Sequence, residues 1–186
     1  DTIRSDDRRV REGLSRGSCR ADFGVGLVCG IVGFFADPRL AGALRPEALT
    51  PLLDAIVARG PDGEGRLVHG GLVMGMRRLS VIDLSTGGQP LLSRDGRVAA
   101  FQNGEIYNYR QLRIELMSLG YGFTTQSDTE VLAHGFDAWG IEGLLDRLDG
   151  MFAIAILDKD EGLLHLARDR LGEKPLYYTH APGRAF

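Results

Sequence analysis

The residue whose side chain is best suited to covalent chemistry is a cysteine at the start of an apolar run. The segment Cys29-Gly-Ile-Val-Gly33 places glycines close to the thiol, so a ligand or another backbone can approach it. A thiolate is the best side-chain nucleophile at neutral pH, provided that a base lies within reach. A single cysteine on an apolar strand is also common as a small core residue. The residues that surround Cys29 determine whether it is a nucleophile or a core residue.

Two kinds of base are available to this thiol. The four histidines, His69, His134, His165 and His180, lie in unrelated contexts and lack metal-ligand spacing. We therefore predict that they are surface or packing residues and that the chain has no metal site. The α-amine of Cys29 is the other candidate, because an ordinary α-amine pKa of about 7.7–8.0 leaves it partly neutral at working pH. This base exists only if Cys29 is the first residue.

Three further motifs carry polar residues, and each has a structural and a functional interpretation. Arg59, before Gly-Pro-Asp, is either a cation at a helix end or a bidentate ligand for a carboxylate. Asn103-Gly104 is typical of a type I′ hairpin turn, but amide and backbone donors also suit an oxyanion. Asp128 either complements a helix N-terminus or binds a cation. The residues alone leave these alternatives open.

Hydrophobic periodicity predicts the elements that must position these residues. We expect a buried strand at 29–35, a helix at 47–60, strands at 71–84 and 96–105, a helix at 108–120, a helix that opens at the capping box 127–130 and continues to Trp139, and a hairpin at 151–169. The strand at 96–105 should run into a turn at Asn103-Gly104. Strands first, helices in the middle and strands again favour sheet layers covered by helices.

Composition excludes several classes of protein. The chain has 186 residues, 44% hydrophobic and 25% charged, with a net charge of −3. This balance indicates a globular domain that is neither a nucleic-acid partner nor a membrane protein, and we expect it in the cytoplasm. Its two cysteines, Cys19 and Cys29, cannot form a disulfide framework. No apolar stretch approaches the roughly 18 residues that span a bilayer.

Residues 1–28 differ from the rest of the chain. They mix charges with Gly and Ser, begin with Asp, and predict a disordered, extraneous or processed leader. The apolar run before Cys29 is too short for a secretory signal, and Val28 is bulky for a cleavage site. Only Lys159 and Lys174 are lysines among 22 basic residues, which suggests a GC-rich gene in which a GTG codon for Val28 is the true initiator. We therefore predict a mature chain that begins at Cys29.

Six motifs occur in an order that resembles a known family. They are Cys29-Gly-Ile-Val-Gly33, Arg59-Gly-Pro-Asp-Gly-Glu-Gly65, Arg77-Arg-Leu-Ser-Val-Ile-Asp-Leu84, Asn103-Gly-Glu-Ile-Tyr-Asn108, Ser127-Asp-Thr-Glu130 and Ala167-Arg-Asp-Arg-Leu-Gly172. Together they resemble the class II glutamine amidotransferase domain of asparagine synthetases, over residues 29–180. The resemblance implies an α+β fold: a four-layer α/β/β/α N-terminal-nucleophile hydrolase sandwich with two antiparallel sheets.

The resemblance also implies a role for each candidate residue. Cys29 attacks the side-chain amide of glutamine, while the Asn103 side chain and the Gly104 N–H form the oxyanion hole. Arg59 binds the α-carboxylate of glutamine, Asp128 binds its α-ammonium, and Glu105 lies beside the substrate amine. Met76 stands where many relatives have histidine, and we interpret it as a packing residue.

The resemblance further implies a partner domain. Relatives pass ammonia to a C-terminal ATP-pyrophosphatase synthetase domain that adenylates aspartate, so ATP and Mg²⁺ are expected only there and no cofactor is expected in this domain. The Ser-Gly-Gly-x-Asp-Ser phosphate loop is absent from the sequence, which indicates a fragment in which residues 181–186 begin the connection. The alternatives are an amidotransferase of another asparagine-synthetase-like pathway, another thiol amidohydrolase, or a catalytically silent interaction domain if residues 1–28 are retained. A homodimer is compatible with any of them.

Overall fold

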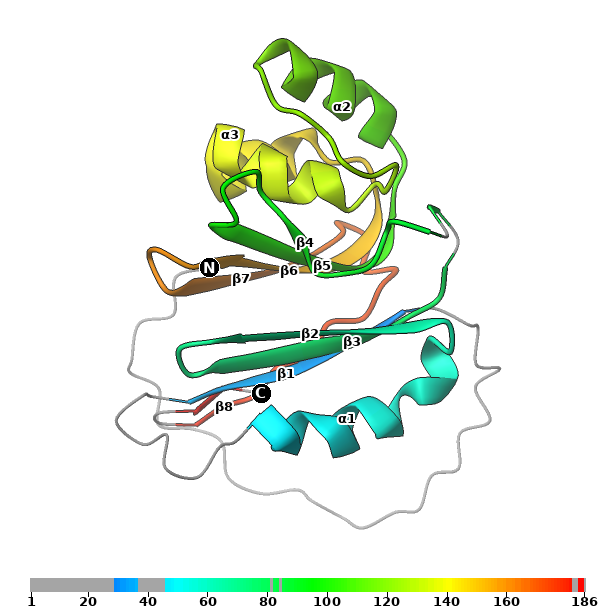
Figure 1. The fold of residues 1–186 in the computed structure, drawn as a ribbon, viewed down its shortest axis with the longest axis vertical. Helices are drawn as coiled ribbons and strands as arrows, with labels where there is room; N and C mark the ends of the chain where they lie inside the picture. Colours follow the sequence, from blue (N-terminus) through cyan, green and yellow to red (C-terminus); the bar gives the residue numbers. More distant parts are fainter. Residues whose placement is uncertain (1–28, 37–45, 81, 84, 182–183, 186) are drawn as a thin grey trace.

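The elements of the chain lie in four layers (Figure 1). The computed structural model describes residues 29–36, 46–80, 82–83, 85–181 and 184–185. Helices α2 (Tyr109–Ser118) and α3 (Glu130–Arg147) cover one sheet, and α1 (Leu49–Ala55) covers the outer face of a second sheet. The predicted α/β/β/α sandwich is confirmed.

Both sheets are antiparallel. The first has the order β4-β5-β6-β7, with strands Leu91–Leu92, Val98–Ile106, Gly150–Asp158 and Leu163–Arg168. The second has the order β2-β3-β1-β9-β8, with β1 Gly30–Ala36, β2 Gly63–His69, β3 Leu72–Arg78, β8 His180–Ala181 and β9 Arg184–Ala185. Strand β1, which follows Cys29, therefore lies inside its sheet between β3 and β9.

Alternation along the strands sorts the side chains into three cores. On β3, Leu72, Met74 and Met76 pack between the sheets, whereas Val73 packs against α1. The first part of β5, residues 98–101, is buried on both faces, which explains its continuous apolar sequence. Met76 is fully buried, which confirms its role in packing. Burial of each large apolar side chain contributes about 1.5–3 kcal/mol to folding, so these cores hold the strand ends in fixed positions.

The helix expected at 47–60 is divided into three shorter pieces. A 3₁₀ turn, Pro46–Ala48, precedes α1, and a second one, Val57–Arg59, follows it. The β-branched pair Ile56 and Val57 weakens the helix there. Gly60 then passes so close to β3 that an added Cβ would lie 2.4 Å from the Arg77 carbonyl carbon and oxygen. The chain must leave the helical path to make this contact.

The expected capping box at Ser127–Glu130 does not form. The Ser127 hydroxyl accepts a hydrogen bond from the Thr129 N–H, and α3 begins only at Glu130. The Glu130 carboxylate accepts four hydrogen bonds, from the N–H and hydroxyl groups of Thr124 and Thr125. Contacts with the preceding loop therefore replace the local cap. Helix α3 also extends beyond Trp139 to Arg147, with a kink at Gly140.

Other expectations about elements have mixed outcomes. The strands at 29–35 and 71–84, the helix at 108–120 and the hairpin at 151–169 correspond to β1, β3, α2 and β6–β7. Strand β2 was not predicted, because its alternating glycines hide the period. Predictions about residues 1–28, Cys19 and Val28 among them, lie outside the described residues. Within the described part of the chain, no helix has the length and apolarity that crossing a membrane requires.

Candidate active site

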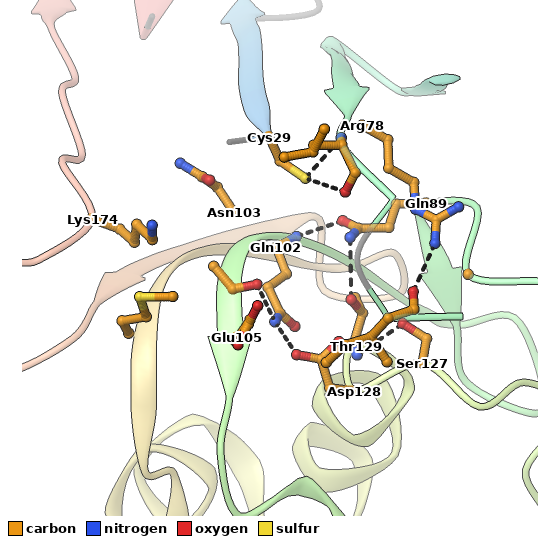
Figure 2. A pocket seen from close by; sticks show the side chains of 15 residues that line it. Cys29, Arg78, Gln89, Gln102, Asn103, Glu105, Ser127, Asp128, Thr129 and Lys174 are labelled. Carbon is orange, nitrogen blue, oxygen red and sulfur yellow. Dashed lines mark hydrogen bonds between the residues drawn. The ribbon is translucent and has the colours of Figure 1, made fainter. Parts of the chain in front are cut away.

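One cavity of about 230 Å³ collects most of the candidate residues (Figure 2). It lies where the start of β1, the end of β3, β5 and the N-terminus of α3 meet. The described residues that line it include Cys29, Arg78, Leu79, Gln89, Gln102, Asn103, Gly104, Glu105, Asp128, Thr129, Met151 and Lys174. Five of the six predicted site residues are among them; Arg59 is not.

The Cys29 thiol is held by the backbone of the strand end beside it. Its Sγ atom accepts a hydrogen bond from the Leu79 N–H at 3.3 Å and donates one to the Leu79 carbonyl at 3.6 Å. Burial raises the pKa of this thiol, although the Leu79 N–H and the charge of Arg78 act in the opposite direction. The resting group is therefore a neutral thiol at pH 7, and nucleophilic attack requires a base.

Three of the histidines lie away from this cavity, as predicted. His69 Nε2 lies 3.0 Å from the Lys159 carbonyl, in a hairpin remote from the thiol. His134 is buried against the Phe123 ring, and His165 lies against the Phe136 ring. None of these three rings lines the cavity. The base for Cys29 must come from another group.

Asn103 and Gly104 lie inside β5 and form no turn. Asn103 pairs with Ala153 and Gly104 with Phe152, and the strand continues to Ile106. The hairpin-turn interpretation is therefore wrong, because the partner strand β6 extends past this point. Gly104 has a φ of 128°, and an added Cβ would lie 1.9 Å from the Met151 carbonyl oxygen. Only glycine fits there.

The Asn103 side chain brings unused hydrogen-bonding capacity to the cavity. The residue is 5% exposed, and its Oδ1 atom has no hydrogen-bond partner among the residues that the structure describes. A buried polar atom without a partner costs about 1–3 kcal/mol, so such an atom commonly marks a place where a ligand binds. The amide of Asn103 is therefore available to a molecule in the cavity.

Asp128 is the buried acid of the cavity. Its Oδ2 atom accepts hydrogen bonds from Gln102 Nε2 at 2.6 Å and from the Ile106 N–H at 2.9 Å. Burial raises the pKa of Asp128, and these two hydrogen bonds oppose that rise. The carboxylate is 5% exposed and lacks a salt-bridge partner among the described residues. A cationic ligand would therefore be stabilised beside it.

Arg78 is the basic counterpart that sequence reasoning missed. Its Nη2 atom donates to the carbonyl of Ile82 at 3.0 Å and to that of Asp83. Gly87 leaves the space for this group, since an added Cβ would lie 2.5 Å from the same nitrogen. Arg78 belongs to the motif Arg77-Arg-Leu-Ser, which was recognised for its resemblance without a role for either arginine.

Arg59 takes a different place from the one expected. Its Nε atom donates to the Cys29 carbonyl at 3.4 Å, and its side chain passes over Gly30. It lines a second, largely apolar cavity of about 480 Å³ between the sheets, which Asn103 also borders. Arg59 is therefore not on the wall of the cavity that Asp128 lines, because the 3₁₀ turn after α1 directs it to the Cys29 backbone carbonyl.

A glutamine residue joins the walls of the cavity. Gln89 Oε1 accepts a hydrogen bond from the Gln102 N–H at 2.6 Å, and its Nε2 donates to the Thr129 hydroxyl at 3.1 Å. The loop after β3 is thereby tied to β5 and to the start of α3 (Figure 2). Neither spacing nor residue type in the sequence indicated this link.

The same loop is anchored at its surface by Asp83. This carboxylate accepts hydrogen bonds from the N–H groups of Thr86 and Gln126, each at 2.8 Å. The hydrogen bond from the Thr86 side chain, with these N–H donors, lowers the pKa of Asp83 to about 2. Within the part of the chain that the structure describes, no group of three or more His, Cys, Asp or Glu side chains is placed to hold a metal ion.

Comparison with known proteins agrees with this geometry. The two-sheet sandwich superposes with a TM-score of 0.58 on a glutamine phosphoribosylpyrophosphate amidotransferase from B. subtilis, at 24% identity, over 85% of this chain and 40% of that one. The chain thus shares the fold of that amidotransferase. The sequence profile of the glutamine amidotransferase domain matches residues 28–186, and the chain belongs to this family.

Asparagine synthetases are among the proteins that this chain resembles. The chain is 45% identical over 153 residues to asparagine synthetase [glutamine-hydrolyzing] 1 of Bacillus subtilis, covering 82% of this chain and 24% of that protein. It is 37% identical over 150 residues to the asparagine synthetase [glutamine-hydrolyzing] of Triphysaria versicolor, covering 81% and 25%. The chain therefore spans about a quarter of the length of these relatives.

Proposed function

We propose that this chain hydrolyses glutamine to glutamate and ammonia, with Cys29 as the nucleophile. The observation that carries the proposal is a single cavity with a thiol, the Asn103 amide, a buried carboxylate and a fixed guanidinium on its walls. An α-amino acid is a zwitterion and needs a cation and an anion in one pocket. A carboxamide under attack needs donors beside its oxygen. The cavity meets both requirements.

Arg78 and Asp128 bind the two charges of the amino acid. The Arg78 guanidinium, held by two backbone carbonyls, presents its remaining N–H donors to the α-carboxylate. Asp128 accepts from the α-ammonium, and Glu105 adds a second carboxylate on the same side. Arg59 acts on the nucleophile through the Cys29 carbonyl, which amends the role that resemblance assigned to it.

The first stage forms a thioester. The α-amine of Cys29 takes the thiol proton, the sulfur bonds to the carbonyl carbon (Cδ) of the glutamine side-chain amide, and the carbonyl π electrons move onto the oxygen. When this oxyanion collapses, the C–N bond breaks, and the departing nitrogen takes the proton back from the α-ammonium as ammonia. The Asn103 amide and the Gly104 N–H stabilise the oxyanion.

The second stage releases glutamate. The α-amine takes a proton from water, and the water oxygen bonds to the thioester carbon. The resulting oxyanion collapses, the C–S bond breaks, and the thiolate regains the proton. The γ-carboxylic acid then ionises at neutral pH. The raised pKa of the Cys29 thiol and the remoteness of three histidines support an internal α-amine as the base.

The ammonia would serve an ATP-dependent synthesis of asparagine from aspartate in a further domain. This part of the proposal rests on the names of the relatives and on the quarter of their length that the chain spans. ATP and Mg²⁺ would act only in that domain. Use of ammonia by another asparagine-synthetase-like pathway is the alternative. Cytoplasmic location, a homodimer and the absence of a cofactor from this domain stay predictions.

The decisive experiment compares two forms of the chain. One is expressed from Val28 as Met, so that removal of Met leaves Cys29 first; the other retains residues 1–28, as intact mass must show. We expect glutamate release from the first form only, and none after Cys29→Ala. Equal activity in both forms would exclude the α-amine as the base. An inactive but folded first form would refute the proposed hydrolysis.

A further inference from the structure

The last of the six motifs, Ala167-Arg-Asp-Arg-Leu-Gly172, has no part in the proposed chemistry, yet its aspartate is almost fully buried. Asp169 is 5% exposed. Its Oδ2 atom accepts hydrogen bonds from the Phe152 N–H at 3.2 Å and the Lys174 N–H at 3.0 Å, and its Oδ1 accepts from the Glu173 N–H at 2.9 Å. Burial would raise the pKa of Asp169, but these backbone donors lower it. The carboxylate therefore organises the turn after β7 as an anion.

This turn is fixed next to the oxyanion side of the cavity. Phe152 pairs with Gly104 in the β5–β6 register. One carboxylate oxygen thus joins the residue opposite Gly104 to the backbone of Lys174. The packing is tight, since a Cβ on Gly104 would lie 2.9 Å from the Phe152 Cα. The backbone of Lys174 is consequently held in register with Gly104.

The Lys174 side chain then completes the charge pattern of the cavity. It lines the same space as Asn103, Gly104 and Met151. Figure 2 shows Lys174 and Arg78 on opposite sides, with Cys29 and Asn103 between them. Because Arg78 suits the α-carboxylate, the positive charge of Lys174 faces the other end of the substrate, where the γ-carbonyl meets Asn103 and Gly104.

We propose that Lys174 stabilises negative charge on the oxygen of the substrate's γ-carboxamide group, called the γ-oxygen below. Asp169 is the positioning residue that holds Lys174 there. The inference rests on the proposed function. Lys174 gains and loses no proton in this role; it only faces the oxygen that receives the carbonyl π electrons.

Charge at the γ-oxygen distinguishes three species. Bound glutamine is neutral there, whereas the tetrahedral oxyanion and the γ-carboxylate of glutamate are both negative. A cation at this position therefore favours the transition state and the product over the substrate. Removal of the charge should lower kcat, leave KM for glutamine nearly unchanged, and weaken inhibition by glutamate.

The test uses the form of the chain that begins at Cys29, with Lys174→Met, Lys174→Arg and the matched control Lys159→Met. Lys159 is the other lysine and donates to the Gly96 carbonyl in a hairpin away from the cavity. For Lys174→Met we expect a roughly three- to tenfold lower kcat, less than the ~10²–10³ of a direct oxyanion donor. The inhibition constant of glutamate should rise about two- to fivefold, as for a partly solvated ion pair. Arginine should restore both values, and the control should change neither.

Asp169→Asn tests the positioning role separately. The amide retains the shape but replaces one acceptor oxygen with a donor, so the turn loses part of its hold on Lys174. We expect the same pattern of lower kcat and weaker glutamate inhibition, with little further effect when Lys174→Met is added. If Asp169→Asn does not fold, the Lys174 variants still decide the main inference.

The possible failures are distinguishable. No turnover by the folded parent protein refutes the proposed function, and this inference with it. Turnover by the parent with unchanged kcat and unchanged glutamate inhibition in Lys174→Met overturns the role of Lys174 alone. A raised KM for glutamine with a lowered melting temperature, not restored by arginine, would show a merely structural lysine and also overturn it.

Discussion

Gly30 and Gly104 each stand next to a reacting group of the proposed site, yet their surroundings resist change to very different degrees. A Cβ on Gly30, beside the nucleophile, would lie 2.9 Å from Ile56 Cδ1 and 3.3 Å from Arg59 Cδ, which are side-chain atoms that can shift. A Cβ on Gly104 would lie 1.9 Å from the Met151 carbonyl oxygen, which is backbone inside a sheet. The oxyanion side is therefore rigid, and the nucleophile side is adjustable.

The difference suits the proposed chemistry. Donors to an oxyanion act best when they need no reorganisation, and the pairing of Asn103 and Gly104 with β6 provides such rigidity. The nucleophile must instead change bonding partners through two stages, while its own amine moves protons. Its position at the very start of β1, with the thiol held by the Leu79 backbone, leaves that freedom.

The strongest way to break this comparison is to add a methyl group on each side. Gly104→Ala should abolish measurable turnover, because the strand must move and the N–H donor with it; loss of one such donor alone costs ~10²–10³. Overpacking should also lower the free energy of unfolding by about 1–3 kcal/mol. Gly30→Ala should stay active within about tenfold, since rotamer shifts absorb the strain. Paired assays of kcat and thermal unfolding check both; equal losses would contradict the contrast.

The next effect concerns the Asn103 amide. Asn103→Asp preserves the shape but puts a carboxylate where negative charge develops, so kcat should fall by ~10²-fold or more. Because Asn103 lies inside β5, turn formation offers no competing explanation. Calorimetric titration with glutamine should show that binding persists. A wild-type kcat in the folded variant would remove Asn103 from the oxyanion hole.

A smaller effect separates the two arginines. Arg78→Ala should lower kcat/KM roughly ten- to hundredfold, mainly through KM, because a charge-assisted hydrogen bond contributes about 1.5–3 kcal/mol. Asp128→Ala should act similarly from the other side. Arg59→Ala should leave KM nearly constant and lower kcat instead, as its Nε contacts the Cys29 carbonyl. Steady-state kinetics on the three variants test this assignment. A raised KM in Arg59→Ala alone would show that Arg59, and not Arg78, binds the α-carboxylate of glutamine.

The smallest effect lies in the loop that follows β3, on the nucleophile side. The pKa of Asp83 in the folded chain is about 2, below its usual 3.8, so its contribution to stability is present above pH 4 and disappears as the pH falls toward 2. Asp83→Asn should therefore be less stable than the parent at pH 7, and the difference should narrow as the pH falls through 2. Solvent screening keeps the difference small. Denaturant unfolding at pH 7 and at pH 2 measures it; a difference as large at pH 2 as at pH 7 would exclude the carboxylate charge.

Local patterns predicted the scaffold better than the details of the site. The fully apolar run 151–157 survives folding because β6 is buried on both faces, and the helical spacing of Leu112 and Leu116 survives because α2 buries one face. The Asn103-Gly104 turn and the Ser127–Glu130 capping box failed for a common reason. Both are local hydrogen-bonding preferences of about 1 kcal/mol, and the paired strand β6 and the buried Glu130 outweigh them.

The sequence by itself determined the family and the layered α+β fold and indicated Cys29 as the candidate nucleophile, because ordered motifs and apolar periods are properties of residue type and spacing. Tertiary structure alone decided which arginine lines the cavity with Asp128. Arg59 and Arg78 have the same side chain and comparable motifs, and only the 3₁₀ turn after α1 and the carbonyls of Ile82 and Asp83 direct one to the Cys29 backbone and the other into the cavity. It likewise brought Lys174 beside Gly104, because one carboxylate oxygen of Asp169 binds two chain segments that are 22 residues apart in sequence.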